Sequence, residues 1–222
     1  MTAPAPPAPP DDDLHDDLDT DEHEPAGWTT SSLVAAAVLG VLATIAVVLA
    51  VRYVSTPREG SVDVGFLQDM TYHHDQAIEI ASIAAENATD REVRSFAREA
   101  LVYQRYELGY MSALLEQWGL GTGDTDRTAM QWMGMSTRLG DMPGMQPDAA
   151  VANARTVTGP SANAEFLRMM SDHHRGGLHM AEYAAERAKD PRVKDLARRM
   201  AEQQSSEVQE LQRTAQRLGV TL

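Results

Sequence analysis

Cysteine is absent from the 222 residues of this chain. Its absence excludes disulfide bonds, cysteine zinc fingers and thiol nucleophiles, and it is compatible with any redox compartment. Phenylalanine is scarce, with three residues, whereas methionine occurs twelve times. Methionine usually fills irregular space in hydrophobic cores, but its thioether is also a ligand for soft metal ions such as Cu(I).

Basic residues are absent from residues 1–32, which hold nine Asp and Glu, and the whole chain has a formal net charge of -14. This charge argues against nucleic acid as a partner, because phosphates would be repelled. Residues 1–10 are rich in Pro and Ala, and residues 11–24 are mostly acidic. A sequence of this kind cannot bury a core, so we predict a disordered acidic tail over residues 1–32.

Charged residues are also absent from the apolar run Leu33 to Val51. The run is long enough to cross a bilayer as a helix, so we predict a transmembrane helix over residues 33–54 and a linker over residues 55–62. Trp28 and Tyr53 flank it as interfacial aromatics do. A buried soluble helix is rarely apolar on every face, and the acidic segment before the run is atypical of a cleaved signal peptide.

The rest of the chain matches itself at an offset of 100 residues. Met70-Thr-Tyr-His-His74 corresponds to Met170-Ser-Asp-His-His174, and the flanking match extends without a gap to Gly119 and Gly219. This register predicts one structural unit used twice.

Each unit has the sequence of a helical hairpin. Asp63 and Asn163 are candidate N-caps of the first helices. Thr89 to Glu92 resembles a capping box, and Asp190 followed by Pro191 is a typical helix start. We predict hairpins over residues 63–119 and 161–222, joined by a Met-rich connector over residues 120–160 with a short helix near residues 125–139. The predicted fold class is all-α, an antiparallel four-helix bundle of two repeated hairpins preceded by one transmembrane helix.

Polar residues interrupt the apolar faces of these helices at equivalent positions. Spacings of three and four place the first histidine of each pair on the inner face of the first helix, with the second at its flank, and Gln-x-x-Glu on the inner face of each second helix. A carboxylate on such a face is costly unless it is paired or bound to a metal. The candidates are His73, His74, Glu107, His173, His174 and Glu207, with Gln104 and Gln204 beside them.

Two interpretations of this polar layer remain open. The His and Glu side chains could satisfy one another in a structural layer. They could instead coordinate a metal together with thioethers, because spacings of four put Met and His on one helix turn. The further candidate ligands are Met70, Met169, Met170 and His179. A ferritin-like di-metal oxidase is disfavoured, because Glu-x-x-His is absent from both hairpins, and we recognise no catalytic constellation.

The connector contains a second group of candidate ligands for Cu(I). Its methionines are spaced Met-x2-Met and Met-x-Met on a segment that looks open, because the surrounding Gly, Pro and Asp offer little core. They are Met130, Met133, Met135, Met142 and Met145.

The doubled Phe-x3-Met-x2-His-His motif at Phe66 and Phe166, with Gln-x-x-Glu on each following helix, resembles the bacterial family called domain of unknown function 305. The resemblance covers residues 61–219. It implies a ferritin-like four-helix bundle, exported or membrane-anchored, and some members bind copper through His and Met. It therefore favours copper as the ion and an extracytoplasmic C-terminal domain, whereas Arg52 and Arg58 after the span favour the cytoplasm. We predict a membrane-anchored copper-binding or copper-buffering protein; the alternative is a structural or protein-interaction module.

Overall fold

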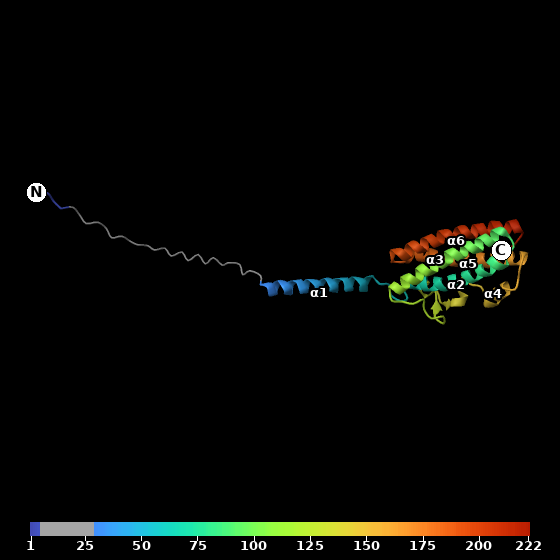
Figure 1. The fold of residues 1–222 in the computed structure, drawn as a ribbon, viewed down its shortest axis with the longest axis horizontal. Helices are drawn as coiled ribbons and strands as arrows, with labels where there is room; N and C mark the ends of the chain where they lie inside the picture. Colours follow the sequence, from blue (N-terminus) through green and yellow to red (C-terminus); the bar gives the residue numbers. More distant parts are fainter. Residues whose placement is uncertain (5–28) are drawn as a thin grey trace. The chain divides into compact units, whose positions relative to one another are not determined.

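The computed structural model describes residues 1–4 and 29–222, without the side chains of residues 52–55. This part of the chain is mostly helical, with six α-helices, two short 3-10 turns and one two-stranded hairpin (Figure 1). It divides into two compact units, Met1–Val51 and Arg52–Leu222. Most of the predicted acidic tail, including Trp28, lies outside the described residues.

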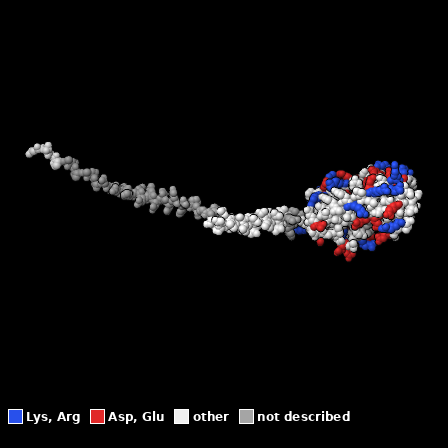
Figure 2. All heavy atoms as spheres, viewed as in Figure 1, with Lys and Arg blue, Asp and Glu red and all other residues white. Residues whose placement is uncertain are grey.

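Helix α1 (Thr30–Ser55) carries the apolar run. Its segment Thr30–Val51 is long and apolar enough to cross a membrane, with a mean hydropathy of 2.8 and no part of the most apolar stretch buried. Lys, Arg, Asp and Glu are absent from this segment, whereas charges of both signs are interspersed over the surface of the second unit (Figure 2).

The second unit is built on four long helices, α2 (Val62–Asn87), α3 (Arg91–Gln117), α5 (Pro160–Arg187) and α6 (Pro191–Leu218). Helix α2 packs along α3 and α5, and α5 packs along α6. Asp90 and Asp190 are the N-caps of α3 and α6, so the second predicted cap is confirmed and the first lies one residue after Thr89. Gly219 ends α6 in the left-handed conformation, where glycine has no steric cost.

Asp63 and Asn163 are not the helix caps that the sequence predicts. Helix α2 is capped by Ser61, whereas Asp63 accepts hydrogen bonds from Lys189 N at 2.9 Å and Asp190 N at 2.7 Å, in the turn between α5 and α6. Asn163 accepts from Thr89 N at 2.9 Å and Asp90 N at 3.1 Å, in the turn between α2 and α3. Each side chain therefore satisfies two backbone donors at the tip of the opposite hairpin.

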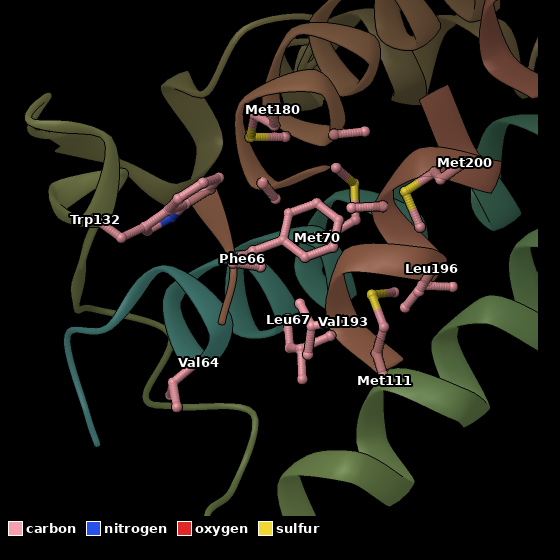
Figure 3. Close-up of a cluster of buried hydrophobic side chains, with 14 of the residues drawn as sticks. Val64, Phe66, Leu67, Met70, Met111, Trp132, Met180, Val193, Leu196 and Met200 are labelled. Atoms are coloured by element: carbon pink, nitrogen blue, oxygen red, sulfur yellow. The ribbon is translucent and has the colours of Figure 1, made fainter. Parts of the chain in front are cut away.

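The hydrophobic core forms two clusters. One contains residues from the beginning of α2 and α6 and the end of α3 and α5, among them Phe66, Met70, Met111, Leu196 and Met200 (Figure 3). The other contains residues from the opposite ends of these helices, such as Ile80, Ala97, Phe166, Met170 and Leu211. In sequence, the buried His, Gln and Glu residues of each helix fall between its contributions to the two clusters.

The connector folds differently from the prediction. The prediction of a helix near residues 125–139 is wrong. The structure has the strand pair β1 (Thr128–Ala129) and β2 (Thr137–Arg138), the 3-10 turns η1 (Gln131–Met133) and η2 (Leu139–Asp141), and α4 (Asp148–Ala154). Met130 and Gly134 flank η1 with φ of 62° and 73°, and these left-handed residues prevent a longer helix.

The connector is not an open segment either, because a buried carboxylate holds it against α2. Asp69 is fully buried and accepts hydrogen bonds from Met130 N and Trp132 Nε1, both at 2.7 Å, and pairs with Arg127. Met130 and Met142 consequently join the first cluster at 0% and 2% exposure. Met133 and Met145 are partly buried, and Met135 remains exposed.

Candidate metal centre

Four buried histidines form the centre of the second unit. They are His73 and His74 on α2, and His173 and His174 on α5, and none is more than 1% exposed. Burial follows from the helical period, because each His pair falls between two apolar turns of its helix. All four therefore lie among the interior side chains, as the sequence predicts for residues of an inner face.

The second histidine of each pair bonds a glutamate on the neighbouring helix. His74 Nε2 lies 2.9 Å from Glu107 Oε2, and His174 Nε2 lies 2.7 Å from Glu207 Oε2. The two pairs have the same separation of 33 residues in sequence. Glu107 is therefore the partner of His74, the histidine that the helical wheel places at the flank.

The first histidines of the two pairs form a tilted stack. The ring centroids of His73 and His173 are 3.8 Å apart, and the ring planes are inclined by 40°. His73 Nε2 donates to the carbonyl of Pro143 in the connector at 3.1 Å, and His173 Nε2 donates to the backbone carbonyl of His73 at 3.0 Å. The connector is therefore part of the environment of the histidines.

Two adjacent glycines bring the connector and a glutamine to these rings. A Cβ at Gly176 would lie 1.9 Å from the carbonyl oxygen of Pro143, so only glycine lets the connector backbone reach α5 there. A Cβ at Gly177 would lie 2.6 Å from Gln204 Oε1 and 3.2 Å from His73 Cε1. Sequence reasoning did not identify these residues, although a Gly pair inside a long helix is a signal of close approach.

Burial keeps the stacked histidines neutral. Loss of hydration, reinforced by the nearby His74, lowers the pKa of His73 to about 3. Burial and the neighbouring His73 likewise hold the pKa of His173 well below its usual value. For Glu207, burial opposes ionisation, but the hydrogen bond and charge of His174 outweigh it, and the pKa of the carboxyl lies below its ordinary value. The layer thus offers neutral imidazoles beside an ionised carboxylate.

The lowered histidine pKa values predict a protein that is destabilised by mild acid. Above the unfolded pKa of about 6.5, neither the folded nor the unfolded state protonates His73. Below this pH the unfolded chain binds a proton, whereas His73 in the folded state stays unprotonated down to about pH 3. The free energy of unfolding therefore falls by about 1.4 kcal/mol per pH unit for each such histidine. Denaturant unfolding of the metal-free protein at pH 7.5, 6.5 and 5.5 measures this slope before carboxylates titrate. A constant stability over that range would contradict the prediction.

Glu107 supports a second stability prediction. Its side chain is 8% exposed, and Glu107→Ala leaves His74 without a partner at either ring nitrogen. We expect a loss of about 1–3 kcal/mol in the free energy of unfolding. Glu116→Ala, at an exposed position of the same helix, is the matched control and should change stability little. Equal stability of the two variants would show that the His74–Glu107 pair contributes nothing.

The remaining candidate ligands differ in how deeply they are buried. Met70 packs among apolar side chains of the first cluster (Figure 3), and Met169 and Met170 belong to the second. Gln104 and Gln204 are 3% exposed. His179 is exposed on α5 and is not among the buried histidines.

The chemistry of these donors fits a soft or borderline metal ion. Nδ1 of His73, His74 and His174, and Oε1 of Gln104 and Gln204, are buried and have no hydrogen-bond partner among the described residues. Such atoms are costly to bury unless something pairs with them. Within residues 1–4 and 29–222, however, no three His, Asp or Glu side chains form a group that could hold a metal ion. In the described layer each glutamate therefore pairs with Nε2 of one histidine, His74 or His174, and Nδ1 of that histidine forms no hydrogen bond.

Comparison with known proteins places this chain in a family. A family model described as domain of unknown function (DUF305) matches residues 63–215. The chain belongs to the DUF305 family. It is similar to a DUF305 protein from Streptomyces coelicolor that is assigned as secreted, with 36% identity, a TM-score of 0.69, and coverage of 74% of this chain and 98% of that one. No curated protein matched the chain.

Two further solved structures of the family are similar. A DUF305 fragment from Deinococcus radiodurans is 31% identical, with a TM-score of 0.61 and coverage of 70% of this chain and 96% of that one. CopM in its Cu(II)-bound form is 25% identical, with a TM-score of 0.56 and the same coverage. The family thus includes a protein solved with copper bound.

Proposed function

We propose that this protein is a membrane-anchored metal-binding protein that binds or buffers copper through His and Met side chains. One observation carries the proposal: four buried histidines lie in one region of the core, and three of them have a ring nitrogen that finds no partner in the described part of the chain. A purely structural layer would be expected to satisfy these atoms, whereas a metal ion uses them as ligands.

The proposed ligands are the histidines, their paired glutamates and the thioethers one turn away on the same helices. Gln104 and Gln204 would support them. The set consists of His73, His74, His173, His174, Glu107, Glu207, Met70, Met169 and Met170, with Met133, Met135 and Met145 of the connector as more accessible thioethers. Copper is the favoured ion, since imidazole and thioether together suit it, and CopM, a relative, has a Cu(II)-bound form.

The proposed architecture is a ferritin-like antiparallel four-helix bundle of two repeated hairpins. The equivalent His–Glu pairs, the reciprocal bonds of Asp63 and Asn163, and the packing of α2 with α3 and α5 support it. The proposed organisation is an acidic tail over 1–32, a span over 33–54, a linker over 55–62, hairpins over 63–119 and 161–222, and a connector over 120–160.

The proposed anchor is α1, with the second unit outside the cytoplasm. A helix that exposes apolar side chains on every face is stable in lipid and not in water. The relative assigned as secreted supports the extracytoplasmic side, whereas the two arginines after the span favour the cytoplasmic side.

A metal titration of the full chain in detergent tests the proposal. Cu(I), Cu(II) and Zn(II) are added to the protein while bound metal and the melting temperature are followed together. Copper binding with a raised melting temperature is the expected result, because a ligand that binds only the folded state stabilises it. No binding at micromolar metal would overturn the proposal.

A structural or protein-interaction module is the second candidate. His74–Glu107 and His174–Glu207 are complete hydrogen bonds between protein groups, which favours a layer that fixes helix register. Val102 and Tyr106 on α3 are also 67% and 66% exposed and could contact a partner. Unchanged stability on addition of every metal would favour this function.

A further inference from the structure

A groove on one side of the molecule reaches the histidine layer. It lies between α3, α5 and α6, and its lining includes Ala100, Met170, His174 and Glu207. His174 is 1% exposed, and within residues 1–4 and 29–222 its Nδ1 has no hydrogen-bond partner. The glutamate at this side is also the more accessible one, since the side chain of Glu207 is 21% exposed and that of Glu107 is 8% exposed.

The counterpart of this groove, at positions 100 residues away, is filled. Met200 corresponds to Ala100, and Leu196 corresponds to Phe96, which lines the groove. Met200 and Leu196 pack with Met70 and Met111 in the first hydrophobic cluster (Figure 3). The longer side chain of Met200, which is 0% exposed, occupies the space that Ala100 leaves open, so the two sides of the layer differ in access.

The rim of the groove is acidic, and the counterpart is not. Glu99 and Glu210 line the groove, and the corresponding residues are Arg199 and Tyr110. Glu99 accepts a hydrogen bond from Ser95, and Glu210 lies 3.9 Å from the mostly exposed Arg213. Together with Glu207 they place three carboxylates at one opening, and such a cluster raises the local concentration of cations.

We propose that this groove is the entrance through which a metal ion reaches the histidine layer. The carboxylates of Glu99 and Glu210 attract the cation, and Glu207, Met170 and His174 receive it first. This inference rests on the proposed metal binding and adds the route of exchange: the ion enters and leaves on the α3–α5–α6 side, and Met200 closes the α2 side.

Metal-exchange kinetics of the full chain in detergent test this entrance. Cu(I) is supplied anaerobically as its cationic acetonitrile complex, samples are quenched with bicinchoninate at successive times, and the visible absorbance of the bicinchoninate complex gives the copper not yet taken up. Ala100→Met copies the residue of the closed side and should slow uptake about tenfold with an unchanged final amount of bound copper. Glu99→Gln with Glu210→Gln should slow uptake about threefold at low salt, and the difference should vanish at high salt.

Matched controls lie on the exposed face of α3. Ala113→Met and Glu116→Gln make the same changes away from the groove, and both should take up copper at the wild-type rate. Melting temperatures show that each variant is folded, and the charge variants test the entrance even where Ala100→Met does not fold.

The possible outcomes distinguish a failure of metal binding from a failure of the entrance. Wild-type protein that takes up no Cu(I) overturns the proposed metal binding itself. Wild-type protein that binds Cu(I), with groove variants that exchange as fast as their controls, leaves metal binding in place and overturns the entrance.

Discussion

Asp69→Ala should destabilise the second unit by about 3–5 kcal/mol, the largest loss that we expect from a single substitution. The carboxylate is fully buried and accepts from two donors of the connector while pairing with Arg127. Removing it leaves a partly buried guanidinium without its counter-charge, together with an unpaired backbone N–H and an unpaired indole N–H. Since these bonds hold the connector to α2, the variant should also expose Trp132, which is 8% exposed.

Guanidinium unfolding measures the free energy, and tryptophan fluorescence reports the connector. Asp69→Asn keeps the shape and one acceptor oxygen, so it should lie between Asp69→Ala and wild type. Asp126→Ala changes an exposed aspartate of the same connector and is the matched control. Wild-type stability in Asp69→Ala would show that the connector is held by apolar packing alone.

His73→Leu combined with His173→Leu should lower the affinity for copper at least about 100-fold, or about 2.7 kcal/mol. The double change replaces two stacked imidazoles with apolar side chains of similar size. At pH 7 the metal-free protein should lose about 1–3 kcal/mol of stability, because the carbonyl oxygens of Pro143 and of residue 73 lose the hydrogen bonds that the two rings donate. Its loss of stability between pH 6.5 and 5.5 should also diminish, since the two groups that resist protonation are gone.

A competition titration against a copper chelator measures the affinity. His179→Leu is the control, because His179 is exposed on the same helix as His173, and it should leave affinity and acid sensitivity unchanged. Copper affinity that survives the double substitution would exclude the stacked pair as ligands. A larger effect of His179→Leu would move the site to the surface of α5.

The long helices could be predicted from the sequence because their signals are local. Apolar spacing and the residues Asp190, Pro191 and Gly219 mark helix positions and ends within one or two turns. The same spacing placed His73 and His173 on inner faces, and both are buried. It could not select which histidine of a pair meets the glutamate, because one step along a helix turns a side chain by about 100° and neighbouring positions both reach the interface.

The connector and the hairpin tips could not be predicted, because their partners are distant in sequence. Asp63 has the composition signal of a cap, yet its oxygen bonds Lys189 N and Asp190 N more than 120 residues away. Nothing in the sequence around Asp69 on α2 indicates that its carboxylate accepts hydrogen bonds from Met130 N and Trp132 Nε1. The sequence suggests an open connector for the same reason, because the helix side chains that Met130 and Met142 pack with are distant in sequence.

The crossed bonds of Asp63 and Asn163 have a consequence for the folding pathway. The tip of each hairpin obtains two of its backbone hydrogen bonds from a side chain at the base of the other. A hairpin that forms alone therefore leaves these donors to water, and its tip is completed only on docking. The rate-limiting step should thus require both halves of the chain at once, and unfolding should be a single cooperative transition without a half-folded intermediate.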